Sequence, residues 1–588
     1  MIEIGYIVTI FSAVLFFCTA FADIFVLPKT FAMLAGLACI WSWAATNRRV
    51  CRPAPTWLDV PMLAFGLAMA VTTATSQDLY LSLIGQHLGQ FNSCLAFGVV
   101  AAAFFGARYG RGDIDATVVA RLALVAAVPL SMYGIVQAFG KDPVLQRFAV
   151  FFGGRIFVGH GSPVYLGALL AMLLPAAVHF ATQDENGDDM VIGTVSTFFI
   201  CVALALTKTR GAMMAAAGGV AVLLALRHGM ASRSAKLAWA GAFALPFVLG
   251  RAALLSDLGR LEVWRVAVRV FADHRWLGTG PDTFGLAFRQ HIAPQFITAM
   301  TNATIISPTA HNDFLQVAAT MGVLGLLAYA WVLLGAVLMV RDGLRCGFKD
   351  GYNNALIVGS CGAALLIAAK VNPVSLAPLV LLALMLGGMP VNTVYAMPAW
   401  TWRLREAIGG HVRVAGFASV IAMLGVTGVM LAAERAQRRA VAWGDKMQPV
   451  RAAVEYNRAA QINRWDIFYT QKQVEFLAGM IGLAKPEQRP MMAQVGVNIA
   501  RRQVRLHPAD GDAYALLAHA LVVQTLVAQV DNTGEALDAL KTARTLAPTF
   551  PGVLYAMKNV ATYRGDLKTL REVDAQIALV SRAAEARP

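Results

Sequence analysis

Long apolar runs recur along most of this 588-residue chain. Runs such as GYIVTIFSAVLFFCTAFADIFVL and MGVLGLLAYAWVLLGAVLMV are long enough to cross a hydrocarbon core of roughly 30 Å. Hydrophobic residues make up 58% of the chain and charged residues only 14%, whereas an average soluble protein carries about 25% charged residues. We therefore interpret the runs as transmembrane helices of an all-α, polytopic membrane protein.

The apolar segments predict about twelve or thirteen membrane spans. They lie near residues 5–24, 30–46, 57–75, 91–107, 117–138, 161–181, 190–206, 210–227, 235–255, 313–340, 353–370, 374–390 and 414–433. The first run follows an acidic residue and no Lys or Arg, so we expect a membrane anchor rather than a cleavable signal. The cysteines form no CxxC pair, and their pattern predicts neither a zinc site nor a disulfide framework.

The net charge of +15 raises the question of nucleic-acid binding. Such binding needs a contiguous basic stripe, whereas here the basic residues lie between apolar spans. Loops such as NRRVCRP, RHGMASRSAK and RDGLRCGFK each carry at least two of them, as expected of cytoplasmic loops. This asymmetry predicts a cytoplasmic N-terminus and places the long loop 256–312 on the opposite side.

After Glu434 the composition changes to that of a soluble helical region, and we identify no apolar run of spanning length there. Three strings, starting at Asn457, Arg501 and Lys541, repeat a helix end, a turn near Pro508 or Pro548, and another helix. Their spacing is roughly forty residues, looser than the tetratricopeptide repeat. We expect a short superhelical stack, which serves either as a docking surface or only to cap and rigidify the membrane part.

The string ADGDAY in this region resembles a metal-binding DxD motif through Asp510 and Asp512. It lies in a turn between helices, where Asp and Gly are favoured for conformational reasons. We therefore predict no metal site here.

The outer loop opens with an amphipathic helix in SDLGRLEVWRVAVRVFADHRW. Its apolar residues at helical spacing are expected to pack against the membrane domain: Leu261, Trp264, Val268 and Phe271. Arg265 and Arg269 lie on the adjoining face with Glu262. Arginine binds phosphate oxygens bidentately and keeps its charge, so these residues are candidates for a diphosphate site. The alternatives are interfacial anchoring and a simple pair between Arg265 and Glu262.

Three further residues are candidates for chemistry near the membrane surface. Arg210, in TKTRGA, is a cation between two apolar spans, a costly position that favours function. Arg155 in FFGGRIF is a weaker case of the same kind. His311 ends the outer loop, and an imidazole can accept a proton near neutral pH. An ordinary loop cation and an ordinary polar histidine are the alternatives.

Taken together, these segments resemble the O-antigen ligase and polymerase superfamily of bacterial cell-envelope enzymes. The resemblance rests on TKTRGA, on the Arg265 helix followed by WLGTGPDTF, and on HNDFLQVAATMGVLGLL. TSQDLYLSLIGQHLGQF, YGIVQAFGKDP and KVNPVS also look like that family, and the phrases cover most of residues 57–390 in order. The resemblance implies metal-independent, cofactor-free and inverting transfer of a glycan from undecaprenyl diphosphate to an acceptor hydroxyl, on the periplasmic side of a bacterial inner membrane.

By match of motif, the resemblance implies that Arg210 and Arg265 hold the diphosphate and that His311 orients or deprotonates the acceptor. It further suggests Arg155, Arg269 and Asn312 as substrate-binding residues. The expected organisation is a transmembrane transferase domain, 1–433, with the periplasmic loop 256–312, and periplasmic tetratricopeptide-like repeats over 434–588. The expected partners are the lipid-linked glycan, a glycan or lipid acceptor, membrane lipid, and envelope assembly or export proteins at the repeats, with no nucleic acid.

The acceptor stays open at this point. A surface-polysaccharide polymerase is slightly preferred over an O-antigen ligase, and a protein O-oligosaccharyltransferase is the alternative. A lipid or glycan transporter would favour matched halves with broken helices, which we do not find. A metal-dependent transferase would need paired outer carboxylates, but Asp23 stands alone. A scaffold would not need a dozen spans.

Overall fold

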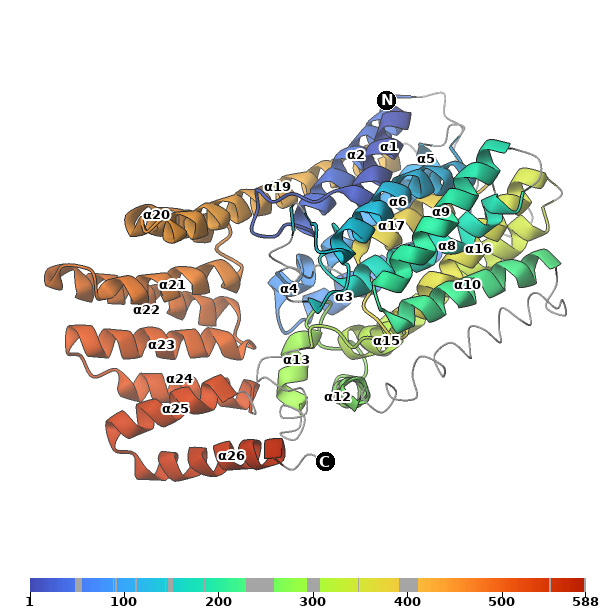
Figure 1. Cartoon of the computed structure of the whole chain (residues 1–588). Coiled ribbons are helices and arrows are strands. Elements are labelled where there is room, and N and C mark those ends of the chain that lie inside the picture. Colours follow the sequence, from blue (N-terminus) through green and yellow to red (C-terminus); the bar gives the residue numbers. More distant parts are fainter. Residues whose placement is uncertain are drawn as a thin grey trace.

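The computed structural model describes the chain except for residues 48–54, 88, 90–91, 111–113, 143, 146–151, 184–186, 229–257, 293–306, 347, 391–410, 549–550 and 586–588. Every regular element in the described residues is a helix, which confirms the predicted all-α class. The helices form a bundle and, beside it, a stack made by the C-terminal part of the chain (Figure 1). The predicted span 235–255 lies outside the described residues.

In the described residues, twelve helices build the bundle, and each corresponds to one predicted span. They are α1 (Ile2–Leu15), α2 (Leu27–Thr46), α3 (Asp59–Ala74), α5 (Cys94–Tyr109), α6 (Ala116–Ala138), α8 (Pro163–Ala181), α9 (Gly187–Leu206), α10 (Arg210–His228), α15 (Asp313–Leu344), α16 (Lys349–Ala369), α17 (Leu376–Gly388) and α19 (His411–Asp445). By length and composition, seven of them could cross a membrane, and four others are shorter apolar helices. The chain is thus a multi-pass membrane protein.

The first helix is shorter than predicted. We expected a span over residues 5–24, but α1 ends at Leu15. The reason is Asp23, whose carboxylate accepts the backbone N–H groups of Phe25, Val26 and Leu27 at 2.8–3.0 Å. These bonds satisfy donors at the start of α2, and they hold the chain between the two helices in a turn.

Glycines allow the bundle helices to approach one another at backbone distance. A Cβ added to Gly36 of α2 would lie 2.3 Å from Oγ1 of Thr9, and one added to Gly193 of α9 would lie 2.1 Å from the backbone nitrogen of Ala181. Small residues are the usual means of helix association in membranes, where apolar burial gives little driving force. The bundle is therefore held together by close packing that a larger side chain would disrupt.

Helix α15 is broken near its start, at Gly322, which has φ 63° and ψ −159°. Residues 276–280, called the WLGTG turn below, lie across the break. Thr279 and Gly280 donate their N–H groups to the carbonyls of Ala319 and Thr320, at 3.2 and 2.9 Å. A Cβ on Gly278 would lie 2.2 Å from the carbonyl carbon of Thr320. The turn thus fixes the short segment 313–321 by direct backbone contacts.

Between the bundle helices, the described residues form three further helices: α4 (Leu79–Leu83), α12 (Leu258–Asp273) and α13 (Phe284–His291). Figure 1 shows α12 nearly end-on, so that it runs across the direction of the long bundle helices. It packs against α13 and against α15. Helices α12 and α13 therefore lie at the end of the bundle where α15 begins.

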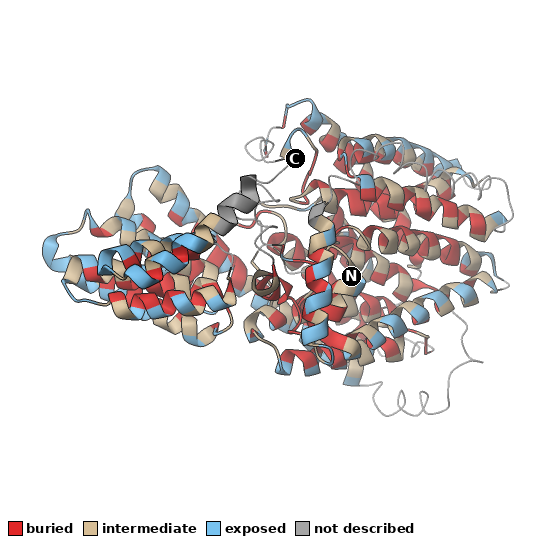
Figure 2. Cartoon of the chain, turned by 90° about the horizontal axis from the view of Figure 1, so that it is seen from below, coloured by how far each residue is buried: buried red, intermediate tan, exposed pale blue. Residues whose placement is uncertain are grey.

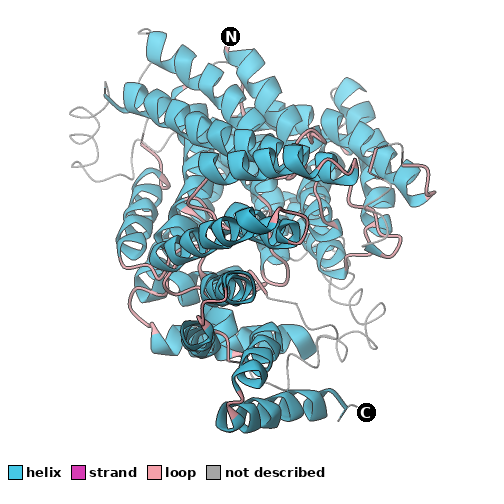
Figure 3. Cartoon of the chain, turned by 90° about the vertical axis from the view of Figure 1, so that its left-hand side faces the viewer, coloured by secondary structure: helices cyan, strands magenta, loops and turns pink. Residues whose placement is uncertain are grey.

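The C-terminal part is a stack of helices, seen from its own side in Figure 3. It comprises α20 (Pro449–Ile462), α21 (Ile467–Ile481), the 3-10 turn Pro486–Gln488, α22 (Arg489–Leu506), α23 (Gly511–Ala528), α24 (Thr533–Leu546), α25 (Pro551–Arg564) and α26 (Leu567–Glu585). The turns predicted near Pro508 and Pro548 are present. Buried residues follow the contacts between helices, while the outward faces are exposed (Figure 2). Neighbouring helices thus bury one another's apolar faces, as predicted.

One expectation for this region was wrong. We identified no apolar run of spanning length after Glu434, yet α23, Gly511–Ala528, is long and apolar enough by length and composition. It packs between α22 and α24 and places Leu516, Leu517 and Leu521 in the core of the stack. A helix covered on two sides by its neighbours can be apolar without facing lipid, which length and hydropathy do not distinguish.

Candidate functional site

The site is built where three connections meet: the one between α9 and α10, the one between α16 and α17, and the start of α15. Their contacts are short and involve backbone as well as side chains. Arg155, from the loop before α8, donates from Nε to the carbonyl of Thr207 and from Nη2 to Oγ1 of Thr209, both at 2.9 Å. Partial burial, and then the nearby charge of Arg260, lower the pKa of Arg155.

Arg210 is the first residue of α10, and its side chain is exposed. Within the described part of the chain, neither Arg210 nor Arg155 forms an ion pair with a carboxylate. The positive end of the α10 dipole adds to the charge of Arg210. The next residue, Gly211, lies so close to the α16–α17 connection that a Cβ on it would be 2.6 Å from Nδ2 of Asn372.

Asn372 is 2% exposed, and its Nδ2 has no hydrogen-bond partner among the described residues. Such a buried, unsatisfied donor is uncommon and calls for an explanation. Its Oδ1 accepts a bond from Nη2 of Arg260 at 3.4 Å. The amide thus connects α10 with α12 and still offers a donor to a ligand.

Arg260, rather than Arg265, is the α12 arginine that contacts this cluster. The two residues are five apart, which is about 140° around a helix. Arg265 has a side chain 68% exposed and bonds Oε2 of Glu262 at 2.8 Å. Arg269 is exposed and approaches the carbonyl of His291 at 3.5 Å. The structure therefore does not bring Arg265 and Arg269 into contact with the other candidates.

The buried face of α12 also differs from the predicted one. The expected inner residues Leu261 and Val268 are 46% and 53% exposed. The buried residues are instead Val263, Val266, Ala267 and Val270, which pack against α13 and the start of α15. This helix has apolar residues on more than one side, so periodicity alone could not identify the buried face. The positions of α13 and α15 determine which face is buried.

His311 lies immediately before α15 and is half-buried, with φ 52°. Left-handed backbone is uncommon outside glycine and is often found at functional sites. Asn312 caps α15 by accepting the N–H of Leu315 at 3.1 Å, and its Nδ2 donates to the carbonyl of Lys370 at 3.2 Å. Lys370 in turn bonds Asp313 at 2.5 and 2.7 Å. His311 is thus held beside the connection that carries Asn372.

The DxD-like residues have a different role. Asp510 caps α23, accepting the N–H of Asp512 at 2.9 Å. Nη1 of Arg289, from α13, lies 3.6 Å from Asp510 and 2.7 Å from Asp512. Burial, and then the charge of Asp512, raise the pKa of Asp510 to about 6. The pair therefore joins the stack to α13.

Part of this cluster lies in a stretch of sequence that is similar to a known protein family. Residues 195–330 match the O-antigen ligase family model. The matched residues include Arg210, Arg260, His311 and the start of α15, whereas Arg155 and Asn372 lie outside them. A comparison with curated proteins gives no match. The match supports a glycan-transferring membrane enzyme that acts on lipid-linked glycan and acceptor substrates.

Sequence reasoning missed Arg260, Lys370 and Asn372. Arg260 stands five residues before Arg265, and it would have been found had Val263, Val266 and Val270 been taken as the buried face. The string KVNPVS contributed to the family resemblance, but its residues do not indicate that the amide of Asn372 contacts α10 and α12. Together, the matched residues 195–330 and the α16–α17 connection bring cations, an amide donor and an imidazole close to one another. Such a set can bind a polyanion beside a proton acceptor.

Proposed function

We propose that the protein transfers a glycan from undecaprenyl diphosphate to an acceptor hydroxyl on the periplasmic side of a bacterial inner membrane, with inversion and without a metal. The observation that carries this proposal is the position of Asn372, which accepts a bond from Arg260 and lies against Gly211, the residue after Arg210. Arg155 bonds Thr209, the residue before Arg210, and Asn312, the residue after His311, bonds the connection that carries Asn372. The O-antigen ligase match over the central residues supports the same reaction class.

In the proposed reaction, the acceptor oxygen attacks the anomeric carbon, and the bond from that carbon to the diphosphate oxygen breaks. The diphosphate leaves with the electron pair, so negative charge grows on it. Arg155, Arg210 and Arg260 would stabilise this charge, because preorganised cations act most strongly where charge develops. Asn372 would donate a further bond. His311 would take the proton of the acceptor.

Arg265 and Arg269 remain in the proposal as substrate contacts on the exposed side of α12, and Asn312 as the residue that fixes His311. For the acceptor, we favour a growing polysaccharide over lipid A-core. The C-terminal stack lies beside the outer loop and is joined to it through Arg289. We propose that this stack, a periplasmic tetratricopeptide-like domain, guides the product or binds envelope proteins.

The proposal is tested with His311→Ala in intact cells, with His291→Ala as the matched control. His291 is a histidine of the same outer loop that pairs with Asp273 at 3.0 Å. Undecaprenyl-linked glycan should accumulate with His311→Ala and not with His291→Ala, at equal amounts of folded protein in the membrane. Unchanged lipid-linked glycan and normal polymer in the His311 variant would contradict the proposed reaction.

A further inference from the structure

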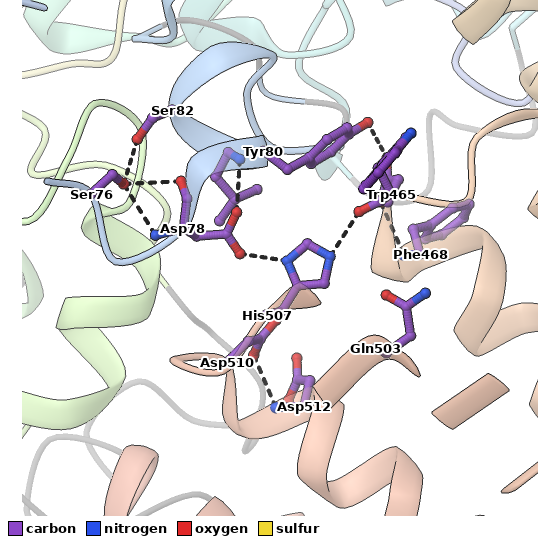
Figure 4. A network of polar contacts seen from close by, with 12 residues as sticks. Ser76, Asp78, Tyr80, Ser82, Trp465, Phe468, Gln503, His507, Asp510 and Asp512 are labelled. Atoms are coloured by element: carbon purple, nitrogen blue, oxygen red, sulfur yellow. Dashed lines mark hydrogen bonds and ion pairs between the residues drawn. The ribbon is translucent and has the colours of Figure 1, made fainter. Parts of the chain in front are cut away.

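The connection between α3 and α4 lies between the C-terminal stack and the WLGTG turn (Figure 4). On the stack side, Oδ2 of Asp78 lies 2.5 Å from Nδ1 of His507. On the other edge of the ring, Nε2 of His507 lies 2.7 Å from the carbonyl of Trp465. Both ring nitrogens thus face acceptors, and only the imidazolium can donate to both. The geometry therefore favours a charged His507 paired with a buried Asp78.

The other groups around His507 support this charge state. Asp510 follows it on the same turn, with Arg289 of α13 beyond that carboxylate. The ring of Tyr80 stands edge-on, with 6.3 Å between ring centroids. Burial favours the neutral imidazole, but the hydrogen bond and the charge of Asp78 outweigh it and raise the pKa of His507.

On the bundle side, the same connection holds the WLGTG turn. The N–H of Gln77 donates to the carbonyl of Thr279 at 2.9 Å. Ser76 shares a hydrogen bond with Ser82 at 2.7 Å, and Ser82 donates to the carbonyl of Pro281 at 2.8 Å. Asp78 itself caps α4 by accepting the N–H of Leu81 at 3.0 Å. The position of Asp78 is therefore coupled to the position of the turn.

The WLGTG turn is also hydrogen-bonded to the short first segment of α15, through the N–H groups of Thr279 and Gly280. That segment ends at the Gly322 break and begins at Asp313, two residues after His311. A continuous series of hydrogen bonds thus leads from the stack, through Asp78 and the WLGTG turn, to the part of α15 that follows His311 and its neighbour Asn312.

We propose that His507 is a positioning residue: through Asp78 the C-terminal stack holds the WLGTG turn, and with it the first segment of α15, in the arrangement that the site requires. The effect on transfer rests on the proposed function, whereas the mechanical coupling does not. His507 touches no substrate in this proposal.

Other contacts keep the stack attached when His507 is changed. Helix α19 runs without a break from the bundle into the stack. His87 stacks on Phe468 at 3.8 Å between centroids and lies 3.5 Å from Oε1 of Glu434, on α19. A His507 variant should therefore loosen the turn without releasing the stack, so that its effect can be measured on folded protein.

The experiment uses the full-length protein in lipid nanodiscs. Hydrogen exchange is measured for peptides covering 276–282 and 313–321 in wild type, His507→Ala, Asp78→Asn and the double variant. The control is Arg501→Ala, which removes an exposed pair with Glu535 inside the stack. Exchange of both peptides should rise several-fold in each single variant and no further in the double variant, because both act through one contact. The control should match wild type.

Transfer is measured on the same samples with a lipid-linked donor. In the His507 and Asp78 variants, kcat should fall while KM for the donor stays near the wild-type value, because the cations that bind the diphosphate are unchanged. Unchanged exchange in both single variants would overturn the positioning role, whatever the activity. Raised exchange in a protein whose wild type transfers no glycan would support the coupling and contradict the proposed function instead.

Discussion

The bundle and the C-terminal stack are both all-helical in the described residues, but they are held together by different means. In the bundle, glycines such as Gly36 and Gly193 let backbones touch, and a Cβ at either position would overlap a neighbour. In the stack, Gly479 and Gly482 face open space. There, the helices bury leucine, valine and alanine side chains against one another. The bundle thus tolerates little change in backbone spacing, whereas the stack tolerates more.

The contact between the two parts combines apolar packing of α19 against α20 and α21 with several buried polar and charged groups. Asp78 meets His507, His87 lies beside Glu434 and Asp466, and Arg289 pairs with Asp512. Such contacts are directional, and breaking one leaves a buried polar group unpaired. A rigid bundle therefore carries the candidate site, and a polar, partly titratable contact attaches the stack to it.

The largest expected effect separates the candidate site from the rest of the molecule. We expect Arg210→Ala to lower the transfer rate by about 100- to 1,000-fold, the range found when one preorganised donor to a developing charge is removed. Its thermal unfolding should stay close to wild type, because Arg210 is exposed. The same assay on Arg501→Ala should show no loss of rate. Near-normal transfer by Arg210→Ala would remove it from the site.

A second prediction tests the difference in packing. Gly36→Val should destabilise the bundle by about 1–3 kcal/mol or more, because the new side chain would overlap Thr9. Gly479→Ala should instead stabilise α21 by about 0.5–1 kcal/mol, since alanine suits an exposed helix interior better than glycine. Thermal unfolding of both variants in the same detergent measures the contrast. Equal shifts of the same sign would show that the two parts are packed alike.

A third prediction concerns pH and the contact between the two parts. Burial lowers the pKa of His507 and His87, but their carboxylate partners outweigh it and raise both pKa values. A raised folded-state pKa means that the stabilisation is complete below the unfolded value of about 6.5 and is lost as pH rises through the folded value. Exchange of peptides spanning 463–468, corrected for intrinsic rates, should therefore increase at alkaline pH. A flat profile would indicate that neither histidine is charged.

The smallest effect is expected on the outer surface of the stack. Arg501 and Glu535 form a 2.8 Å pair, but their side chains are 42% and 44% exposed. Exposed pairs contribute about 0–1 kcal/mol, so Arg501→Ala should shift thermal unfolding only slightly, and less in high salt. A shift as large as that of Gly36→Val would mean that the surface of the stack, rather than the close packing of the bundle, determines stability.

Much of the helical architecture was predictable because apolar runs of membrane length have few alternatives. Twelve predicted spans correspond to helices, and the turns of the stack lie where the prolines suggested. The predicted helix boundaries were wrong where one residue inside an apolar run ends or breaks the helix. Asp23 starts α2 and so ends the first apolar run early. Gly322 breaks α15 within a run that reads as one continuous helix.

The candidate site was only partly predictable. Its residue types were apparent, since a cation beside a membrane is costly and a loop histidine can accept a proton. The choice between Arg260 and Arg265 depended on which side of α12 is buried, and Asn372 depended on the close approach of Gly211. Neither contact can be predicted from the periodicity of apolar residues along the chain.

The sequence by itself determined that the chain is helical and largely apolar, because hydrophobic length and helix periodicity are local properties. Only the tertiary structure decided which arginines meet, which face of α12 is buried, and that Asp78 and His507, far apart in the chain, form one contact. Those outcomes depend on distances between segments, and a side chain's partner is set by the packing of whole helices rather than by its neighbours in sequence.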